Sequence, residues 1–167
     1  AIRSLPGVMK DCAKKGVKAV LLTREFADTD ELESEVMKES LAIAKRAGVR
    51  VLGPNMLGLM RPVIGLNASN YSAKVRPGNL ALVAHSSALC TAMLDWAEAK
   101  GIGFSSVISM GESSDLDFGE ILDYLVADGY TQGILLHVHS IHDARRFMSS
   151  LRAAARGKPV VVIKSGR

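Results

Sequence analysis

The sequence predicts an α/β protein built around a doubly wound, mostly parallel sheet. In its second half, four short apolar segments alternate with three segments of helical periodicity, which is typical of parallel strands joined by right-handed crossovers. The apolar segments are residues 79–84, 104–109, 132–138 and 159–164, and the helical ones are residues 87–100, 117–127 and 142–156. The chain is 48% hydrophobic but only 5% aromatic, so its core consists mainly of aliphatic side chains, which suits strands covered by helices on both faces.

The first half of the chain has the pattern of a smaller unit of the same kind. Residues 5–16 form an amphipathic helical pattern closed by a glycine, and residues 17–23 follow as an apolar strand. A possible capping box, Asp28 with a glutamate three residues later, predicts a helix that runs to about residue 48. Residues 49–53 have the pattern of the next strand. We therefore expect a β–α–β unit, the tail of a sheet whose first strands are missing.

A stretch without clear periodicity separates the two units. Residues 60–78 contain two prolines and no strand or helix pattern, so we interpret residues 63–78 as a linker. The expected division is a first unit of residues 1–62, the linker, and a second unit of residues 79–167. The chain begins with alanine inside a helical pattern and ends where a strand runs into a loop, so we expect it to belong to a longer protein.

The charge, the cysteine count and the hydropathy of the sequence indicate which kinds of partner and setting to expect. The net charge is +4, but basic and acidic residues are interleaved, which favours a small anionic ligand and argues against a nucleic-acid partner. The two cysteines cannot form a disulfide framework, so a reducing, cytoplasmic setting is expected. No apolar run reaches the length of about 18 residues that a membrane helix needs, and no signal peptide is visible.

Histidines and serines follow the strands that flank the expected ligand crevice. Open parallel sheets bind ligands beyond the carboxyl ends of their strands, where the strand order reverses. If the second unit has a flavodoxin-like order, its first and third strands flank that point, and His85, His139 and His142 lie near one crevice. Ser86 or Ser87 would cap the following helix, whose amino end attracts anions. The stretch therefore predicts a binding site for a phosphate or a carboxylate.

Simpler interpretations of the same residues remain open. Serines at a helix start are more often caps than ligand contacts. His137 lies within a strand pattern and is most simply a packed or edge residue. His137 and His139 share one strand face, but no cysteine or carboxylate completes a known ligand spacing, so no metal site is predicted. Cys90, on the helix of residues 87–100, is interpreted as part of the core.

Several motifs, in their order and spacing, resemble the NDP-forming acyl-CoA synthetases, relatives of the succinyl-CoA synthetase α subunit. They cover nearly the whole chain and include VLGPNMLGLMRP, GLNAS, RPGNLALVAHSSAL and GKPVVVIKSGR. The phrases LDWA, LDYL and DARRF are most similar to the synthetase-like half of bacterial protein lysine acetyltransferases that carry a GNAT domain. The resemblance implies that residues 1–62 end a Rossmann-like CoA-binding domain. It also implies that residues 79–167 are a truncated succinyl-CoA ligase-like domain of flavodoxin fold.

The resemblance implies a phosphate-binding element at His85, Ser86, Ser87 and Ala88. The family has Ser-Gln/Arg-Ser-Gly here, with N–H groups that hold the phosphate, and Ser86 matches its second serine. The first serine, the Gln or Arg, and the glycine of that element are replaced here by Ala84, His85 and Ser87.

The resemblance also implies one catalytic position and one cofactor-binding turn. His139 stands where the family has a glutamate that orients a phosphohistidine, and that phosphohistidine loop is expected just beyond this chain. The motif Gly53-Pro54-Asn55 matches the turn near the family's CoA site, although Met56 replaces the Ser or Cys of many members.

The implied activity is the interconversion of acyl-CoA, phosphate and NDP with acid, CoA and NTP. CoA or acyl-CoA and phosphate would bind this chain, and ADP or ATP would bind a nucleotide-grasp domain or subunit outside it. The parent protein would be an acid–thiol ligase, such as an ADP-forming acetate–CoA ligase, or a protein acetyltransferase, with the isolated chain inactive. Neither a metal, a nucleic acid nor a membrane is expected as a partner.

A second hypothesis rests on the altered residues. His139 and the AHSSA stretch favour a non-catalytic module that senses acyl-CoA and regulates a fused GNAT-type lysine acetyltransferase. A flavin-binding flavodoxin ranks third, because the candidate loops lack the aromatic residues expected around a flavin ring.

Overall fold

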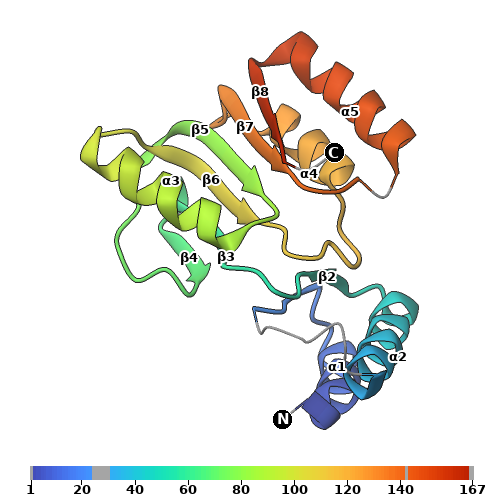
Figure 1. The fold of residues 1–167 in the computed structure, drawn as a ribbon. Coiled ribbons are helices and arrows are strands. Elements are labelled where there is room, and N and C mark those ends of the chain that lie inside the picture. The colour runs from blue at the N-terminus through green and yellow to red at the C-terminus, as the bar shows by residue number, and fades with distance from the viewer. Residues whose placement is uncertain (1, 24–30, 142, 166–167) are drawn as a thin grey trace.

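The computed structural model describes residues 2–23, 31–141 and 143–165, which form two units, each with its own sheet (Figure 1). The first unit comprises η1 (Ile2–Ser4), α1 (Leu5–Lys14), β1 (Ala19–Leu21), α2 (Glu31–Ala47) and β2 (Arg50–Leu52). Strands β1 and β2 are parallel, as the β–α–β pattern predicts. The helices pack on each other around a small core of Met9, Leu22, Ala44, Val49 and Val51.

The second unit is a six-stranded sheet with the order β4-β3-β6-β5-β7-β8. Its elements are β3 (Gly58–Arg61), η2 (Pro62–Ile64), β4 (Leu66–Ser69), β5 (Pro77–Ala84), α3 (Ser87–Ala99), β6 (Phe104–Ser109), α4 (Phe118–Ala127), β7 (Gly133–Val138), α5 (Ala144–Gly157) and β8 (Val160–Lys164). Strands β5 to β8 are parallel, and their order is that of a flavodoxin-like doubly wound sheet. The predicted fold class is confirmed.

Helices cover both faces of this sheet (Figure 1). Successive side chains of a strand point to opposite faces, so neighbouring residues of β5 belong to different cores. Leu82 packs in a cluster with Cys90 of α3. Val83 packs in the other cluster, with Leu122 of α4 and Phe147 of α5. The carboxyl ends of the strands therefore emerge between two helical layers, where a ligand can approach.

The stretch expected to be a linker contains secondary structure. Within residues 63–78, β4 forms and β5 begins, and β3, expected in the first unit, pairs with β6 of the second sheet. Strands β3 and β4 are antiparallel and are joined through Gly65, which has a left-handed φ of 72°. The boundary between the sheets therefore falls before residue 58. Strands of four residues place only two side chains on each face, so their period is too short to recognise in a sequence.

Two sequence-based predictions lie outside the described residues, namely the capping box at Asp28 and the position of His142. Within the described ranges, no helix combines the length and apolar character that crossing a membrane requires.

Candidate functional site

A cleft of about 1150 Å³ opens at the carboxyl ends of β5, β6 and β7. It lies where the strand order of the parallel sheet reverses, at the position predicted for the ligand crevice. Its walls come from the loops after these strands and from the end of β8: His85, Ser86, Leu89, Gly111, Glu112, Ser113, Ser114, Asp115, Asp117, His137, His139, Ser140 and Ser165.

The amino end of α3 forms one part of the wall. Ser86 is the N-cap, and its hydroxyl oxygen accepts a hydrogen bond from the N–H of Leu89 at 3.2 Å. The N–H groups of Ser87 and Ala88 fall in the first turn, where α-helical geometry supplies no acceptor four residues earlier. These donors and the partial positive charge of the helix end make this part of the cleft favourable for an anion.

Ser87 has a different role from Ser86, although the two are adjacent. Its hydroxyl lies 3.4 Å from the carbonyl oxygen of Asn55 and 3.4 Å from the hydroxyl of Ser109. Neither Ser87 nor Ala88 is among the residues that line the cleft. Of the four residues predicted to bind phosphate, the structure therefore places two side chains, His85 and Ser86, on the cleft wall.

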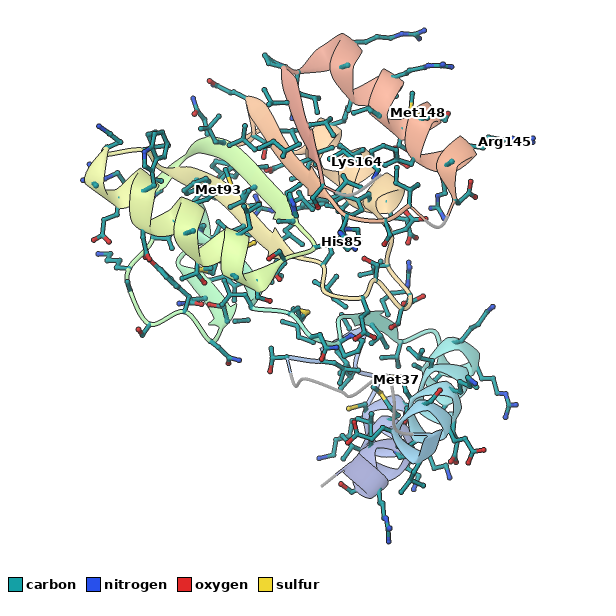
Figure 2. The ribbon with its side chains drawn as sticks, viewed as in Figure 1. Met37, His85, Met93, Arg145, Met148 and Lys164 are labelled. Carbon is teal, nitrogen blue, oxygen red and sulfur yellow. The ribbon has the colours of Figure 1, made fainter. Side chains whose placement is uncertain are left out.

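The histidines form the neighbouring part of the wall. His85 lies at the carboxyl end of β5 (Figure 2), and its Nδ1 accepts the backbone N–H of His139 at 3.0 Å. The ring of His85 also packs edge-on against Phe118, with 4.7 Å between ring centroids. The Nδ1 of His139 lies 3.4 Å from the hydroxyl of Ser165. Because Nδ1 of His85 acts as an acceptor, its neutral tautomer carries the proton on Nε2.

Carboxylates also line the cleft, but protein groups already hold them. Asp115 accepts the N–H of Val51 at 2.8 Å and also pairs with Arg50. Asp117 caps α4 through the N–H of Glu120 at 2.9 Å. These contacts fix the loop between β6 and α4 rather than offering free carboxylates to the cleft.

Arg50, at the start of β2, connects this loop to the first unit. Its guanidinium donates two hydrogen bonds to the carboxylate of Glu120, at 3.0 and 2.8 Å, and a third to Asp115 at 3.0 Å. These hydrogen bonds raise the pKa of Arg50. The hydrogen bonds from Arg50 also hold the pKa of Glu120 below its ordinary value of 4.5, despite partial burial. The network ties the wall of the cleft to β2.

The predicted cofactor-binding turn, Gly53-Pro54-Asn55, packs directly on the same loop. The carbonyl of Pro54 accepts the N–H of Glu112 at 3.1 Å, and the side chain of Asn55 donates to the Glu112 carboxylate. A Cβ atom on Gly53 would lie 2.3 Å from the carbonyl oxygen of Leu22, so only glycine fits there. Residues 53–55 therefore contact a loop that lines the cleft, but they do not line the cleft themselves.

Sequence reasoning missed the walls made by residues 111–117 and the role of Arg50. The stretch GESSDLD, residues 111–117, is a loop that ends in the helix cap Asp117, and this loop also contacts β2. The carboxylates of Asp115 and Glu120 are visible in the sequence, but Arg50, which binds both, lies 65 and 70 residues away from them. A pairing over that distance leaves no local pattern.

Metal binding and the buried thiol of Cys90 are two further candidates for chemistry in the part of the chain that the structure describes. The described residues contain no group of three or more His, Cys, Asp or Glu side chains that could hold a metal ion. Burial raises the pKa of the Cys90 thiol to about 12, so this cysteine remains protonated and unreactive at neutral pH.

Comparison with known proteins agrees with the geometry. Residues 77–167 match the family described as succinyl-CoA ligase-like flavodoxin domain. The chain is 35% identical over 164 residues to the α subunit of acetate–CoA ligase (ADP-forming) I of Pyrococcus furiosus, covering 98% of this chain and 36% of that subunit. It is 38% identical over 168 residues to acetate–CoA ligase (ADP-forming) of Methanocaldococcus jannaschii, covering 98% of this chain and 23% of the relative.

A solved structure is similar over the whole chain. Acetyl-coenzyme A synthetase 1 of Ca. Korarchaeum cryptofilum, in complex with phosphate and ADP, aligns with a TM-score of 0.92 and 32% identity, covering 99% of this chain and 36% of that one. The chain therefore spans about a quarter to just over a third of the length of these relatives.

Proposed function

Since the chain belongs to the succinyl-CoA ligase-like family of NDP-forming acyl-CoA synthetases, we propose that it supplies the phosphate-binding part of an ADP-forming acid–thiol ligase. The reaction is the interconversion of acyl-CoA, phosphate and ADP with acid, CoA and ATP. The two relatives described above are ADP-forming acetate–CoA ligases, and a similar structure is a complex with phosphate and ADP.

The observation that carries this proposal is the amino end of α3 inside the cleft. His85 and Ser86 line the cleft, and the N–H groups of Ser87 and Ala88, in the first turn of α3, would complete an anion site at residues 85–88. His139, which we propose as a residue that contacts the reacting phosphoryl group, reaches the same wall through its backbone hydrogen bond to His85. Phosphate is the substrate that this arrangement suits best.

CoA or acyl-CoA is the proposed second ligand, near the turn at residues 53–55. The turn is fixed against the loop that forms the cleft wall, so a thioester bound there would lie close to the phosphate. Residues 1–57 would form the end of a CoA-binding domain. ADP or ATP is proposed to bind a nucleotide-grasp domain or subunit of the same enzyme. The two cysteines are unpaired, which suits a cytoplasmic setting.

The test is a titration of the isotope-labelled 167-residue chain with inorganic phosphate, followed by amide chemical shifts. We expect saturable shifts at residues 85–89, with sodium chloride of equal ionic strength producing none. Absence of those shifts would refute the phosphate-binding role. A parallel calorimetric titration with CoA is expected to give a weak, millimolar affinity, about −4 kcal/mol, because only part of a CoA-binding domain is present.

One observation favours a second candidate function, a regulatory module that binds acyl-CoA and is fused to a GNAT-type lysine acetyltransferase. An imidazole stands at position 139, and a neutral or cationic imidazole does not replace a carboxylate as the acceptor that orients a phosphohistidine. In that case the whole protein would bind acyl-CoA yet show no ADP-dependent release of CoA. Replacement of His139 by glutamate would then leave this activity absent.

A further inference from the structure

His137, near the end of β7, is a buried imidazole on the cleft wall to which neither candidate function assigns a role. It is 8% exposed, and its Nδ1 atom is buried without a hydrogen-bond partner. Within the described residues its ring makes no hydrogen bond at all. Buried polar side chains are normally hydrogen-bonded, so an imidazole with neither ring nitrogen bonded to protein has a nitrogen to offer a ligand where the ring reaches the cleft.

The position of the ring decides which nitrogen faces the cleft. Nδ1 is closed off from solvent, whereas Nε2 is not among the buried unpartnered atoms, so the accessible edge of the ring carries Nε2. A buried N–H without an acceptor is rarer in proteins than an under-used acceptor. The neutral tautomer with its proton on Nε2 is therefore favoured, and it presents a donor to the cleft.

His137 faces the same side of the sheet as α3. It pairs in register with Ala84, and Ala84 packs in the α3 cluster together with Leu135, two residues before His137 on β7. The carbonyl of His137 also accepts the N–H of His85 at 3.2 Å. The Nε2 donor and the first turn of α3 thus border one part of the cleft.

The rest of the cleft does not favour an anion. The cleft is also lined by Asp115 and Asp117, whose carboxylates pair with Arg50 and with Arg146, the latter at 3.3 Å. An anion is therefore attracted to the side that has helix N–H groups and imidazoles and is repelled from the carboxylate side.

We propose that His137 is an anion ligand of this cleft, donating its Nε2 hydrogen to an oxygen of the phosphoryl group held at the amino end of α3. The proposal rests on the proposed phosphate-binding function and adds a contact to it. The ligand class is a phosphoryl oxyanion, as found in inorganic phosphate and in an acyl phosphate, and both sources share this chemistry.

The test uses three variants of the 167-residue chain and inorganic phosphate as the probe. The amide nitrogen of H137Q can replace Nε2, that of H137N replaces Nδ1, and H137F keeps a ring but no donor. From amide shifts at residues 85–89 we expect phosphate affinity within about twofold of wild type for H137Q and about tenfold weaker for H137N and H137F. Ser106→Ala is the control, since Ser106 in β6 is also buried without a partner but does not line the cleft, and it should leave the affinity unchanged.

The outcomes separate this proposal from the function on which it rests. If phosphate shifts no amide of wild type at residues 85–89, the anion site and the proposed function both fail. If wild type binds and all three variants bind equally well, only the role of His137 is refuted. Nitrogen shifts of the His137 ring should show the Nε2–H tautomer and should move with phosphate. Acetyl phosphate should act like phosphate, and acetate binding as tightly as phosphate would overturn the phosphoryl assignment.

Discussion

A single hydroxyl at Ser86 can be both a helix cap and a ligand contact. Its oxygen accepts the N–H of Leu89, which is the ordinary role of an N-cap serine. A serine hydroxyl has one hydrogen to donate in addition to its two acceptor positions, so capping leaves that hydrogen available for an oxyanion in the cleft. A serine that only caps the helix and a serine that also contacts the ligand have the same geometry here. They differ in how a substitution of Ser86 changes phosphate binding.

Substitutions of Ser86 separate these roles. Ser86→Ala should lower the free energy of unfolding by about 1 kcal/mol through loss of the cap and should weaken phosphate binding. Ser86→Asp should keep the cap, and hence the stability, but should weaken phosphate binding because a carboxylate repels the anion. Denaturant unfolding and phosphate titration measure the two effects.

The matched control is Asp143, the N-cap of α5, whose side chain accepts the N–H of Arg146 at 2.9 Å and does not line the cleft. Asp143→Ala should cost about as much stability as Ser86→Ala and leave phosphate binding unchanged. Phosphate affinity of wild-type strength in Ser86→Asp would mean that the serine only caps the helix.

At the scale of elements, the loop between β6 and α4 is held against the turn after β2 by close backbone packing. Gly111 has a φ of 57°, and a Cβ atom there would lie 1.8 Å from the carbonyl oxygen of Pro54. Gly101, after α3, has a similar φ of 68° but open space around it. The two glycines thus share a conformational requirement and differ only in steric surroundings.

Alanine substitution at these two positions should have unequal effects. Gly101→Ala should destabilise the chain by about 1 kcal/mol, the cost of a left-handed conformation for a residue with a side chain. Gly111→Ala should cost about 3 kcal/mol, because the turn must also move away from the loop. Denaturant unfolding of both variants measures the difference, and equal losses would show that the contact with Pro54 is not tight.

The helices and parallel strands of the second unit were predictable because each has local signals. Asp117 caps α4, as the spacing from Asp117 to Glu120 suggests, and residues 80–84 of β5 are a continuous apolar run. The hairpin of β3 and β4 was not predictable, since its four-residue strands are stabilised by pairing with a distant β6. The positions of His85 and His139 on the cleft followed from topology, whereas that of His137 did not, and the contacts of Arg50 depend on partners far along the chain.

The ion pair between Arg50 and Glu120 should make stability depend on pH in one direction. Arg50 lowers the pKa of Glu120 in the folded chain, so the pair stabilises the fold above the unfolded value near 4.5, and this contribution is lost as pH falls through the lower folded value. Because Arg50 is partly exposed, we expect Glu120→Gln to cost at most about 1 kcal/mol at pH 7.

The loss in Glu120→Gln relative to wild type should shrink below pH 4.5. Unfolding at several pH values between 7 and 3 measures it. Asp123→Asn, which removes a charge from α4 without touching Arg50, is the control and should show no such pH-dependent loss. A loss in Glu120→Gln that stays constant down to pH 3 would contradict the role of the ion pair.

At the scale of the whole molecule, the contacts between the two units bring two proposed ligand positions together. β2 leads into the turn at residues 53–55, this turn packs on the loop at residues 111–116, and that loop forms one wall of the cleft. The amino end of α3 borders the same cleft through Ser86. A thioester bound at the turn and a phosphate bound at the amino end of α3 would thus be positioned by elements that contact one another.

The 167-residue chain should bind phosphate but should not catalyse the full reaction. It spans 36% of the Pyrococcus furiosus subunit and 23% of the Methanocaldococcus jannaschii enzyme, so we expect the groups that bind ADP and accept the phosphoryl group to lie in the remainder. A thiol assay for CoA released from acetyl-CoA, in the presence of phosphate and ADP, should therefore remain at background. Phosphate-induced shifts at residues 85–89 in the same sample would show that inactivity does not result from misfolding. ADP-dependent release of CoA by this chain would overturn the assignment of nucleotide binding to another part of the enzyme.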